Sequence, residues 1–287
     1  HYEPAIKAAK AGKHMIVEKP LAYNVRQARE MIEAAKENKV IMMVGYMKRY
    51  DPGFVYALNQ INKLREEKAI NFARVHCYAG AFDITNDLYK FVVGDDLPKE
   101  ILDKGNEDML AAYEEQLGQK NMGYARLYAG IIGVQLHVLV LLRQAFGKGR
   151  LVGVDVHKER FLTAIYDCGD FCVIFEAGAQ MLMHAWDEKI EVFSHKKNIT
   201  IEFTHPYFKN QCAAVKILED DGAKGSIESL IVPNHEEEYI CELRHFYDCI
   251  TNGKIPYTTA EDAIEDLIMT DEMVRMAAAM NRIDKNE

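Results

Sequence analysis

The sequence lacks a glycine-rich G-x-G-x-x-G turn after a predicted strand, the turn with which a dinucleotide-binding domain normally opens. It also lacks an apolar run long enough to cross a bilayer and a signal-peptide pattern, so we expect a cytoplasmic protein with no membrane partner. The chain is therefore expected to begin inside a nucleotide-binding domain, without roughly 60 to 75 residues at about 30 per βαβ unit. A complete enzyme given only in part and a genuine fragment both remain open.

Positively charged residues are also in the minority. The sequence has 35 Lys and Arg and 44 Asp and Glu, which gives a formal net charge of −9. This balance argues against nucleic acid as a partner. The six cysteines are scattered, and only Cys168 and Cys172 lie close together. A zinc site would need a second close pair of ligands, so we expect no metal. Buried, reduced thiols are the expectation for a cytoplasmic chain.

The overall composition is that of a globular protein, with 49% apolar and 28% charged residues. A chain of 287 residues can bury a sizeable core and is expected to form more than one domain.

Residues 1–50 have the pattern of one strand–helix–strand unit with a helix before it. A helix is predicted over 1–11, a strand over 14–17, a second helix after the capping residue Asn24, and a fully apolar strand over 40–44. Strand, helix and strand in this order predict a right-handed βαβ unit with a parallel sheet. We therefore predict the carboxyl-terminal part of a Rossmann domain.

Residues 51–287 are expected to form a second, α+β domain. Helices are predicted over 54–65, 130–146, 237–251 and 259–280, and their apolar stripes are expected to face the core. The predicted strands share one large, mostly antiparallel open sheet and lie over 71–78, 151–156, 161–166, 171–176, 190–194, 199–203, 213–218 and 226–232. Residues 80–124 have no clean period apart from a helix over 107–117, and we expect an insertion that covers the substrate side or packs on a partner subunit.

Chemistry-bearing side chains follow the first strand directly, in Glu18-Lys19-Pro20. Ligands bind at the carboxyl ends of strands in open α/β sheets, so these residues are expected to lie at a crevice. A Lys held there can donate to a substrate oxygen, and it loses its proton more readily if desolvated. An ordinary surface Glu-Lys pair is the alternative.

A second polar stretch, Gly45 to Pro52, ends the next strand and should face the same crevice. A solvated turn is the alternative. Further candidate substrate contacts, chosen from crevice position alone, are Tyr46, Arg49, Tyr124, Arg126 and Tyr128. For Trp186, the single Trp, and for His184, we expect core or interface packing, with sugar stacking as the alternative.

The order and spacing of several short motifs resemble the Gfo/Idh/MocA family of nicotinamide-dependent sugar oxidoreductases. The motifs are His1, Pro4, Ala8-Ala9, Gly12-Lys13-His14, Glu18-Lys19-Pro20-Leu21-Ala22, Gly45-Tyr46, Arg49, Pro52 and the Gly-rich helix carrying His137. The resemblance covers nearly the whole chain, and it is weak between about Gly80 and Tyr124 and in the late strands.

The resemblance implies two catalytic residues, Lys19 to bind and polarise a substrate hydroxyl and His137 to accept its proton, with both contacting the substrate. A core histidine is the alternative for His137. The family carries an Asp four residues before this His, where the present chain has Gly133. Gly130 and Gly133 are expected on the His137 face of a regular helix, which leaves space for a larger substrate such as a glycoside, or for a side chain from the insertion over 80–124.

The cofactor implied is NAD or NADP, with His1, Glu18, Lys19, Pro20 and Arg49 as its contacts. The function implied is hydride transfer between that cofactor and a hydroxyl carbon of a sugar, cyclitol or glycoside. A glycosidase that acts through transient oxidation and elimination, and a non-catalytic partner subunit, are the alternatives. A homo-oligomer, a dimer or tetramer, is also implied.

Overall fold

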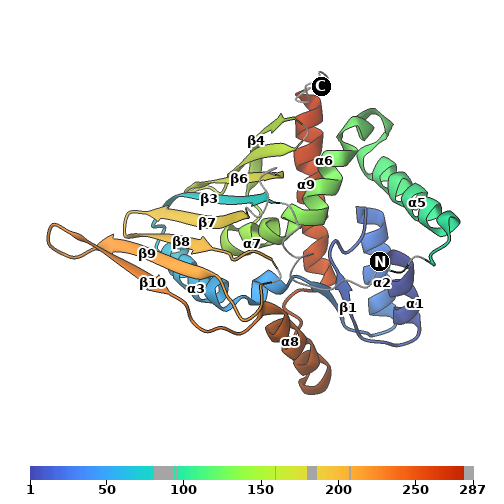
Figure 1. The fold of residues 1–287 in the computed structure, drawn as a ribbon, viewed down its shortest axis with the longest axis horizontal. Helices are drawn as coiled ribbons and strands as arrows, with labels where there is room; N and C mark the ends of the chain where they lie inside the picture. Colours follow the sequence, from blue (N-terminus) through green and yellow to red (C-terminus); the bar gives the residue numbers. More distant parts are fainter. Residues whose placement is uncertain (81–93, 95, 159, 180–185, 207, 281–287) are drawn as a thin grey trace.

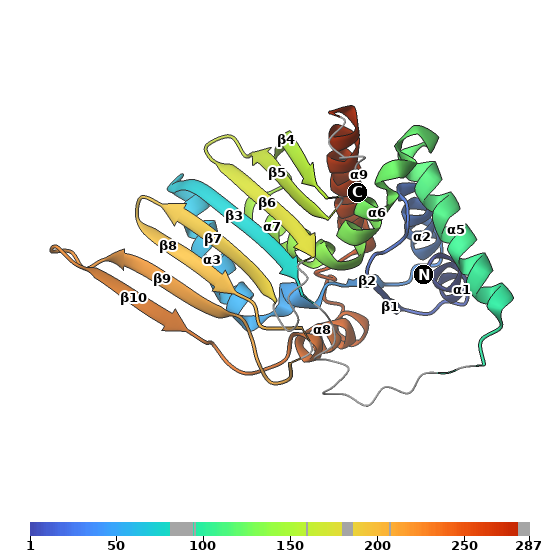
Figure 2. The same cartoon turned by 45° about the horizontal axis from the view of Figure 1, so that its top comes forward.

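The computed structural model describes residues 1–80, 94, 96–158, 160–179, 186–206 and 208–280. A small amino-terminal unit of helices and two strands lies beside a large sheet with helices on one of its faces (Figures 1 and 2). The long carboxyl-terminal helix α9 (Ala260–Ala279) stands between these two parts and contacts both of them.

The amino-terminal unit contains α1 (Tyr2–Lys10), β1 (Met15–Glu18), α2 (Val25–Glu37) and β2 (Met42–Gly45). β1 and β2 pair in parallel, so the predicted βαβ unit is confirmed. The carboxamide of Asn24 accepts a hydrogen bond from the Gln27 backbone N at 2.8 Å, which caps α2 as predicted. The parallel pairing places the carboxyl ends of β1 and β2 at one edge, next to the larger sheet.

The large sheet has the strand order β10-β9-β8-β7-β3-β6-β5-β4. Its strands are β3 (Ile70–Ala79), β4 (Arg150–His157), β5 (Phe161–Asp167), β6 (Cys172–Ala179), β7 (Asp187–Ser194), β8 (Lys197–Glu202), β9 (Ala214–Asp220) and β10 (Ser226–Ile231). Among the described ladders, β3 pairs with β6 in parallel and every other pair is antiparallel. The predicted mostly antiparallel open sheet is confirmed.

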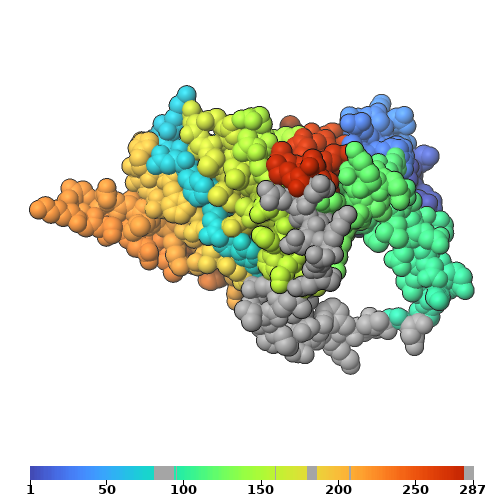
Figure 3. Space-filling model, turned by 90° about the horizontal axis from the view of Figure 1, so that it is seen from above, coloured from blue at the N-terminus to red at the C-terminus, as the bar shows by residue number. Residues whose placement is uncertain are grey.

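The hydrophobic core lies between this sheet and the helices α3 (Pro52–Glu66) and α7 (Leu136–Phe146), which cover one of its faces (Figure 2). Inward side chains such as Val75, Leu139 and Phe175 are completely buried. Burial alternates along the strands, so the other face carries half-exposed apolar residues such as Phe161 and Phe193. The β9–β10 hairpin projects beyond the rest of the molecule (Figure 3).

The apolar helix predicted over 130–146 is one part of a longer helical run with an irregular middle. The run comprises η2 (Gln119–Tyr124), α6 (Ala125–Gly130), the π-helical turn η3 (Ile131–Gln135) and α7. By length and hydropathy Gln119–Phe146 is the one described segment that passes the test for a membrane span. Of its most apolar window, 61% is buried inside the fold, as in the core helix of a globular protein.

Helix α5 (Lys99–Leu117) begins eight residues before the helix predicted over 107–117 and lies against α2. Arg26 of α2 forms an ion pair with Glu115 at 2.6 Å, and the Asn24 Nδ2 donates to the Ala112 carbonyl at 3.2 Å. The described part of the predicted insertion therefore packs on the amino-terminal unit. Residues 81–93 and 95 lie outside the described residues.

The apolar stripe of α8 (Glu238–Asn252) is not a core face, and that prediction is wrong. Leu243 and Tyr247 are 59% and 63% exposed, because α8 lies at the margin of the fold and no described residue covers this side (Figure 1). The stripe of α9 does face the core, since Leu267 and Met273 are buried. Helix α9 begins as predicted, with the Thr259 hydroxyl accepting a hydrogen bond from the Asp262 backbone N at 3.1 Å.

Candidate functional site

Lys19 follows β1 and reaches from the amino-terminal unit to the helical run beside the large sheet. Its Nζ donates a hydrogen bond to the backbone carbonyl of Gly133 at 2.6 Å, across 114 residues of sequence. Burial lowers the pKa of Lys19, and the charge of Lys48 lowers it further, while Glu18 acts in the opposite direction. The ammonium group is thus half-buried at the boundary between the two parts of the molecule.

His137 lies one helical turn after Gly133, at the start of α7. Its ring is half-buried, and its Nδ1 is buried with no hydrogen-bond partner in the described part of the chain. Burial lowers the pKa of His137 well below its usual value, and the charges of Lys19 and Lys48 add to this effect. The imidazole is therefore neutral near pH 7, and the structure brings it to the same helical turn as the Lys19 ammonium.

The π-helical turn η3 contains Gly133 and changes the geometry expected of a regular helix. A π turn holds more residues than an α turn and changes which positions share a face on either side of it. The regular α spacing assumed for Gly130, Gly133 and His137 is therefore not present. A side chain at Gly133 would still have room, because an added Cβ would meet no heavy atom of the described surroundings within 4 Å.

A buried ion pair between Lys48 and Glu188 lies beside these residues, and the sequence did not point to it. The two side chains are 6% and 1% exposed, with Lys48 Nζ 2.5 Å from Glu188 Oε2. Burial acts to lower the pKa of Lys48, but Glu188 and other nearby charges outweigh it and raise the pKa. The sequence offers no signal for this pair, since 140 residues separate its members and only the tertiary packing of η1 beside β7 brings them together.

Three other sequence candidates, His1, Glu18 and Pro20, lie in the loop that Lys19 belongs to or contact it. The His1 Nδ1 is 2.8 Å from the Pro20 carbonyl oxygen, so the start of α1 contacts this loop directly. Glu18 is exposed at the end of β1 and faces Gly45 of β2, where an added Cβ would lie 3.4 Å from its carboxyl carbon. Gly45 itself is buried, and the Glu18 carboxyl group packs against it at the carboxyl ends of the two parallel strands.

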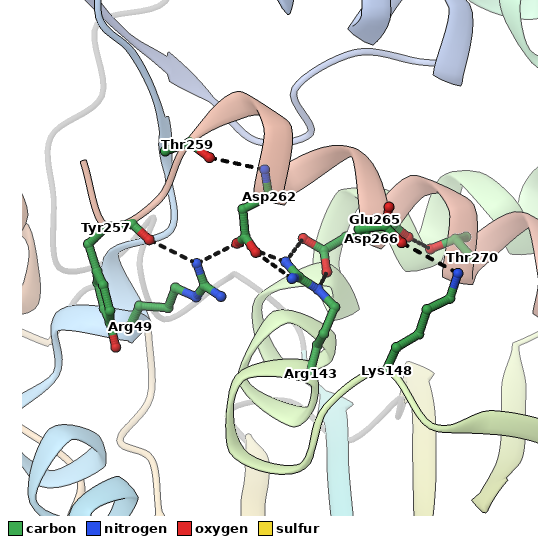
Figure 4. Close-up of polar contacts among 9 residues, drawn as sticks. All are labelled: Arg49, Arg143, Lys148, Tyr257, Thr259, Asp262, Glu265, Asp266 and Thr270. Atoms are coloured by element: carbon green, nitrogen blue, oxygen red, sulfur yellow. Dashed lines mark hydrogen bonds and ion pairs between the residues drawn. The ribbon is translucent and has the colours of Figure 1, made fainter. Parts of the chain in front are cut away.

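Arg49 lies in the turn η1 (Met47–Tyr50) and is 5% exposed within a network of charges (Figure 4). Its Nη1 donates to Asp262 at 2.6 Å, and Asp262 also accepts two hydrogen bonds from Arg143. Arg143 in turn binds Asp266, which is completely buried. The structure thus places Arg49 in a network that joins η1, α7 and α9.

The four remaining candidates differ in burial and in their contacts. Tyr46 is 1% exposed, and its hydroxyl has no hydrogen-bond partner among the described residues. Tyr124 and Tyr128 donate to the carbonyls of Ala277 and Tyr23, at 3.4 and 3.0 Å. Arg126 is exposed and lines an open cavity of about 420 Å³ between α6 and the ends of β5 and β6.

Two carboxyl groups of α8 lie close to the same edge. Burial raises the pKa of Glu242 to about 8, and the nearby Glu18 carboxylate contributes to the increase. Burial also raises the pKa of Glu238 to about 7 against the opposing effect of Lys48. The described residues contain no group of three or more His, Cys, Asp or Glu side chains placed to hold a metal ion.

The described residues fit one end of a nicotinamide dinucleotide. Nucleotides bind beyond the carboxyl ends of parallel strands, and here Glu18, Lys19 and Gly45 occupy that position. The glycine-rich turn that would hold the pyrophosphate is not in this sequence.

Comparison with known proteins agrees with this geometry. A sequence profile described as an oxidoreductase family with an NAD-binding Rossmann fold matches residues 1–46. Scyllo-inositol 2-dehydrogenase (NAD(+)) of Bacillus subtilis is 25% identical over 93% of this chain and 69% of its own length. Myo-inositol 2-dehydrogenase of Thermotoga maritima is 23% identical over 94% of this chain and 72% of its own length.

The fold has solved counterparts. The crystal structure of an aldose-aldose oxidoreductase from Caulobacter crescentus, complexed with glycerol, superposes with a TM-score of 0.66 at 18% sequence identity. The superposition covers 98% of this chain and 74% of that one. Residues 1–46 thus match the NAD-binding Rossmann part of the Gfo/Idh/MocA oxidoreductase family, and most of the chain is similar in sequence to inositol dehydrogenases.

Proposed function

We propose that this protein transfers a hydride between NAD or NADP and a hydroxyl-bearing carbon of a sugar or cyclitol ring. The contact of Lys19 with the Gly133 carbonyl carries the proposal, because it sets an ammonium group on the helical turn that precedes His137. The names of the relatives, two inositol dehydrogenases and an aldose oxidoreductase, support a ring polyol as the substrate.

Lys19 has the role of binding and polarising the reacting hydroxyl. An ammonium group has three donors, and the Gly133 carbonyl uses one of them, so two remain for a substrate oxygen. Positive charge at that point stabilises the negative charge that develops on the oxygen as its proton leaves. The lowered pKa of Lys19 makes its ammonium a stronger hydrogen-bond donor than a fully solvated lysine.

His137 has the role of accepting the hydroxyl proton. Its lowered pKa keeps the ring neutral near pH 7, which a general base requires. The Nδ1 is buried, so the proton goes to Nε2. The nicotinamide ring supplies the hydride acceptor when the cofactor is bound.

The other sequence candidates complete the proposal. His1, Glu18 and Pro20 contact the cofactor from the Lys19 loop, and Arg49 does so from η1, where its ion pair with Asp262 holds the turn in place. Tyr46, Tyr124 and Arg126 belong to the substrate side. We further propose division into domains 1–50 and 51–287, a cytoplasmic location, a homo-oligomer, and neither nucleic acid nor membrane as a partner.

The test is the formation of reduced nicotinamide from NAD⁺ or NADP⁺ with myo-inositol, scyllo-inositol or glucose. Lys19→Met and His137→Asn are each expected to lower kcat/KM by about 10²–10⁴-fold, the usual contribution of a positioned acid or base. The exposed Lys13, six residues before Lys19, offers a matched control in Lys13→Met.

The alternatives give other outcomes in the same assay. Cleavage of an aryl glycoside without net reduced cofactor would replace the dehydrogenase proposal with the oxidation–elimination glycosidase. Calorimetry that detects no binding of NAD(H) or NADP(H) would favour a non-catalytic partner subunit. Full activity of both variants would remove Lys19 and His137 from the catalytic site.

A further inference from the structure

The single tryptophan of the chain is held beside the candidate site by the buried ion pair. The Trp186 Nε1 donates to Glu188 Oε2 at 2.8 Å, and Lys48 Nζ lies 2.5 Å from the same oxygen. One carboxylate oxygen therefore fixes both the indole and the ammonium. Lys48 is close enough to Lys19 and His137 for its charge to lower the pKa of both. The indole is thus anchored to the carboxylate that pairs with Lys48.

Aromatic rings continue outward from Trp186. The His205 ring centroid is 5.6 Å from that of Trp186, and the Phe208 ring stacks on His205 at 5.0 Å with an interplanar angle of 26°. All three residues are half-buried. Ligand sites in proteins are lined mainly by apolar and aromatic side chains with a few fixed polar groups, which describes this row of rings beside Glu188 and Lys48.

Two polar atoms in this group lack partners. Glu188 Oε1 is buried in a residue that is 2% exposed, and within the described part of the molecule nothing donates to it. The buried Nε2 of His205 also has no hydrogen-bond partner among the described residues. Buried polar atoms are nearly always hydrogen-bonded. The two atoms without a described partner, Glu188 Oε1 and His205 Nε2, therefore indicate a polar ligand.

We propose that Trp186, fixed by Glu188 and Lys48, is the platform for a second sugar ring, so that the substrate is a two-ring glycoside. This inference rests on the proposed function, because Lys19 and His137 must hold the first ring. The apolar face of a sugar ring packs on the indole, and its hydroxyls reach the unpartnered atoms of Glu188 and His205. Because the ion pair orients the indole in advance, little conformational entropy is lost on binding.

The alternative role of these rings is internal packing, and fluorescence distinguishes the two. Trp186 is the only tryptophan, so the intrinsic emission of the protein reports on this position alone and requires no catalysis. We would titrate the protein with cellobiose, lactose and maltose, and with glucose, galactose and myo-inositol. At least one two-ring sugar is expected to shift the emission and to bind about tenfold more tightly than its single rings, which corresponds to about 1.4 kcal/mol.

Variants at Trp186 test whether its indole causes the preference for two-ring sugars. Trp186→Ala, measured by calorimetry and by KM, is expected to reduce the ratio of one-ring to two-ring dissociation constants to about one. Trp186→Phe keeps a ring but loses the Nε1 donor, so an intermediate ratio is expected and covers the case in which the alanine variant does not fold. Tyr247→Ala is the control, because that exposed aromatic on α8 lies outside the site and should leave the ratio unchanged.

The outcomes separate this inference from the proposed function. Reduced cofactor formed with no emission change and no preference for two rings would overturn the platform and retain the dehydrogenase. An emission change with two-ring sugars but no reduced cofactor from any sugar would retain the platform and overturn the dehydrogenase. Equal binding of one-ring and two-ring sugars, or no binding of any of them, would overturn the platform.

Discussion

Introducing a carboxylate at Gly133 is expected to raise the pKa of Lys19 and to extend activity to higher pH. In this chain a backbone carbonyl binds the Lys19 ammonium at 2.6 Å, at the residue where the family pattern has an aspartate. An added Cβ at Gly133 meets no described, non-neighbouring heavy atom within 4 Å, so Gly133→Asp fits without displacing its surroundings. The new carboxylate would belong to the same residue as the carbonyl that Lys19 already contacts.

The magnitude follows from this short separation. Opposite charges about 4 Å apart interact by about 1 kcal/mol in water and by about 4 kcal/mol near a protein surface. Lys19 is half-buried, so an energy between these two values applies, and the pKa of Lys19 is expected to rise. The sign is positive because an anion stabilises the protonated amine. Burial and the charge of Lys48 at present lower this pKa, and the aspartate would oppose both effects.

Two assays measure the effect. The alkaline limb of the pH profile of kcat/KM should move upward in Gly133→Asp, and the pH at which trinitrobenzenesulfonate modifies Lys19 should rise equally without any need for catalysis. Gly133→Asn matches the size of aspartate without its charge, and Gly133→Ala tests the added carbon alone. If the Asp and Asn variants had the same alkaline limb and the same modification profile, the electrostatic account of Lys19 would be refuted.

Three further predictions concern stability. Asp266→Ala should lower the free energy of unfolding in urea by about 3 kcal/mol, because it removes the completely buried partner of Arg143. Glu265→Ala removes one partner of a half-exposed ion pair and should change this free energy by only about 0–1 kcal/mol. Equal losses in the two variants would contradict this prediction. Gly53→Ala should destabilise the protein by about 1–3 kcal/mol, because the new Cβ would lie 2.0 Å from a backbone carbonyl oxygen. Gly105→Ala in α5 should stabilise it by about 0.5–1 kcal/mol, because the new Cβ meets no described atom within 4 Å. Thermal unfolding that finds both variants as stable as the parent protein would contradict this prediction. Burial and a neighbouring carboxylate raise the pKa of Glu242 from 4.5 to about 8, so the folded state keeps a proton that the unfolded state releases, and stability should fall as pH rises through this interval. Glu242→Gln should flatten that fall in denaturation curves recorded across the interval, and an unchanged slope would exclude this carboxyl as its source.

The regular elements of the fold were largely predictable from local patterns. The apolar run before Gly45, the Asn24 and Thr259 caps and the alternating strands of the second part were each recognised within a few residues of their observed bounds. Such signals are local, because hydrophobic periodicity and capping depend on neighbours within one or two turns. Lys19 was recognised for the same reason, since a charged residue directly after a strand falls at the edge of the sheet.

Residues whose roles depend on distant partners were not predictable. The contacts of Arg49 are an example, because the sequence does not show that Asp262, 213 residues later, pairs with it in a buried network (Figure 4). The α8 stripe has core periodicity, yet Leu243 is 59% exposed, because periodicity shows that a face is apolar and not that another element covers it. The π-helical turn at Gly133 was not predicted either, because its sequence is equally compatible with a regular α-helix.

By itself the sequence determined the order and type of the helices and strands, the family pattern, and the chemistry available at Lys19 and His137, because backbone propensity and side-chain identity are local properties. Tertiary structure alone decided which charges meet. It set the Lys19 ammonium on the Gly133 carbonyl and paired Lys48 with Glu188 beside Trp186. Electrostatic energy and burial depend on distances in space, and the packing of the whole chain determines those distances.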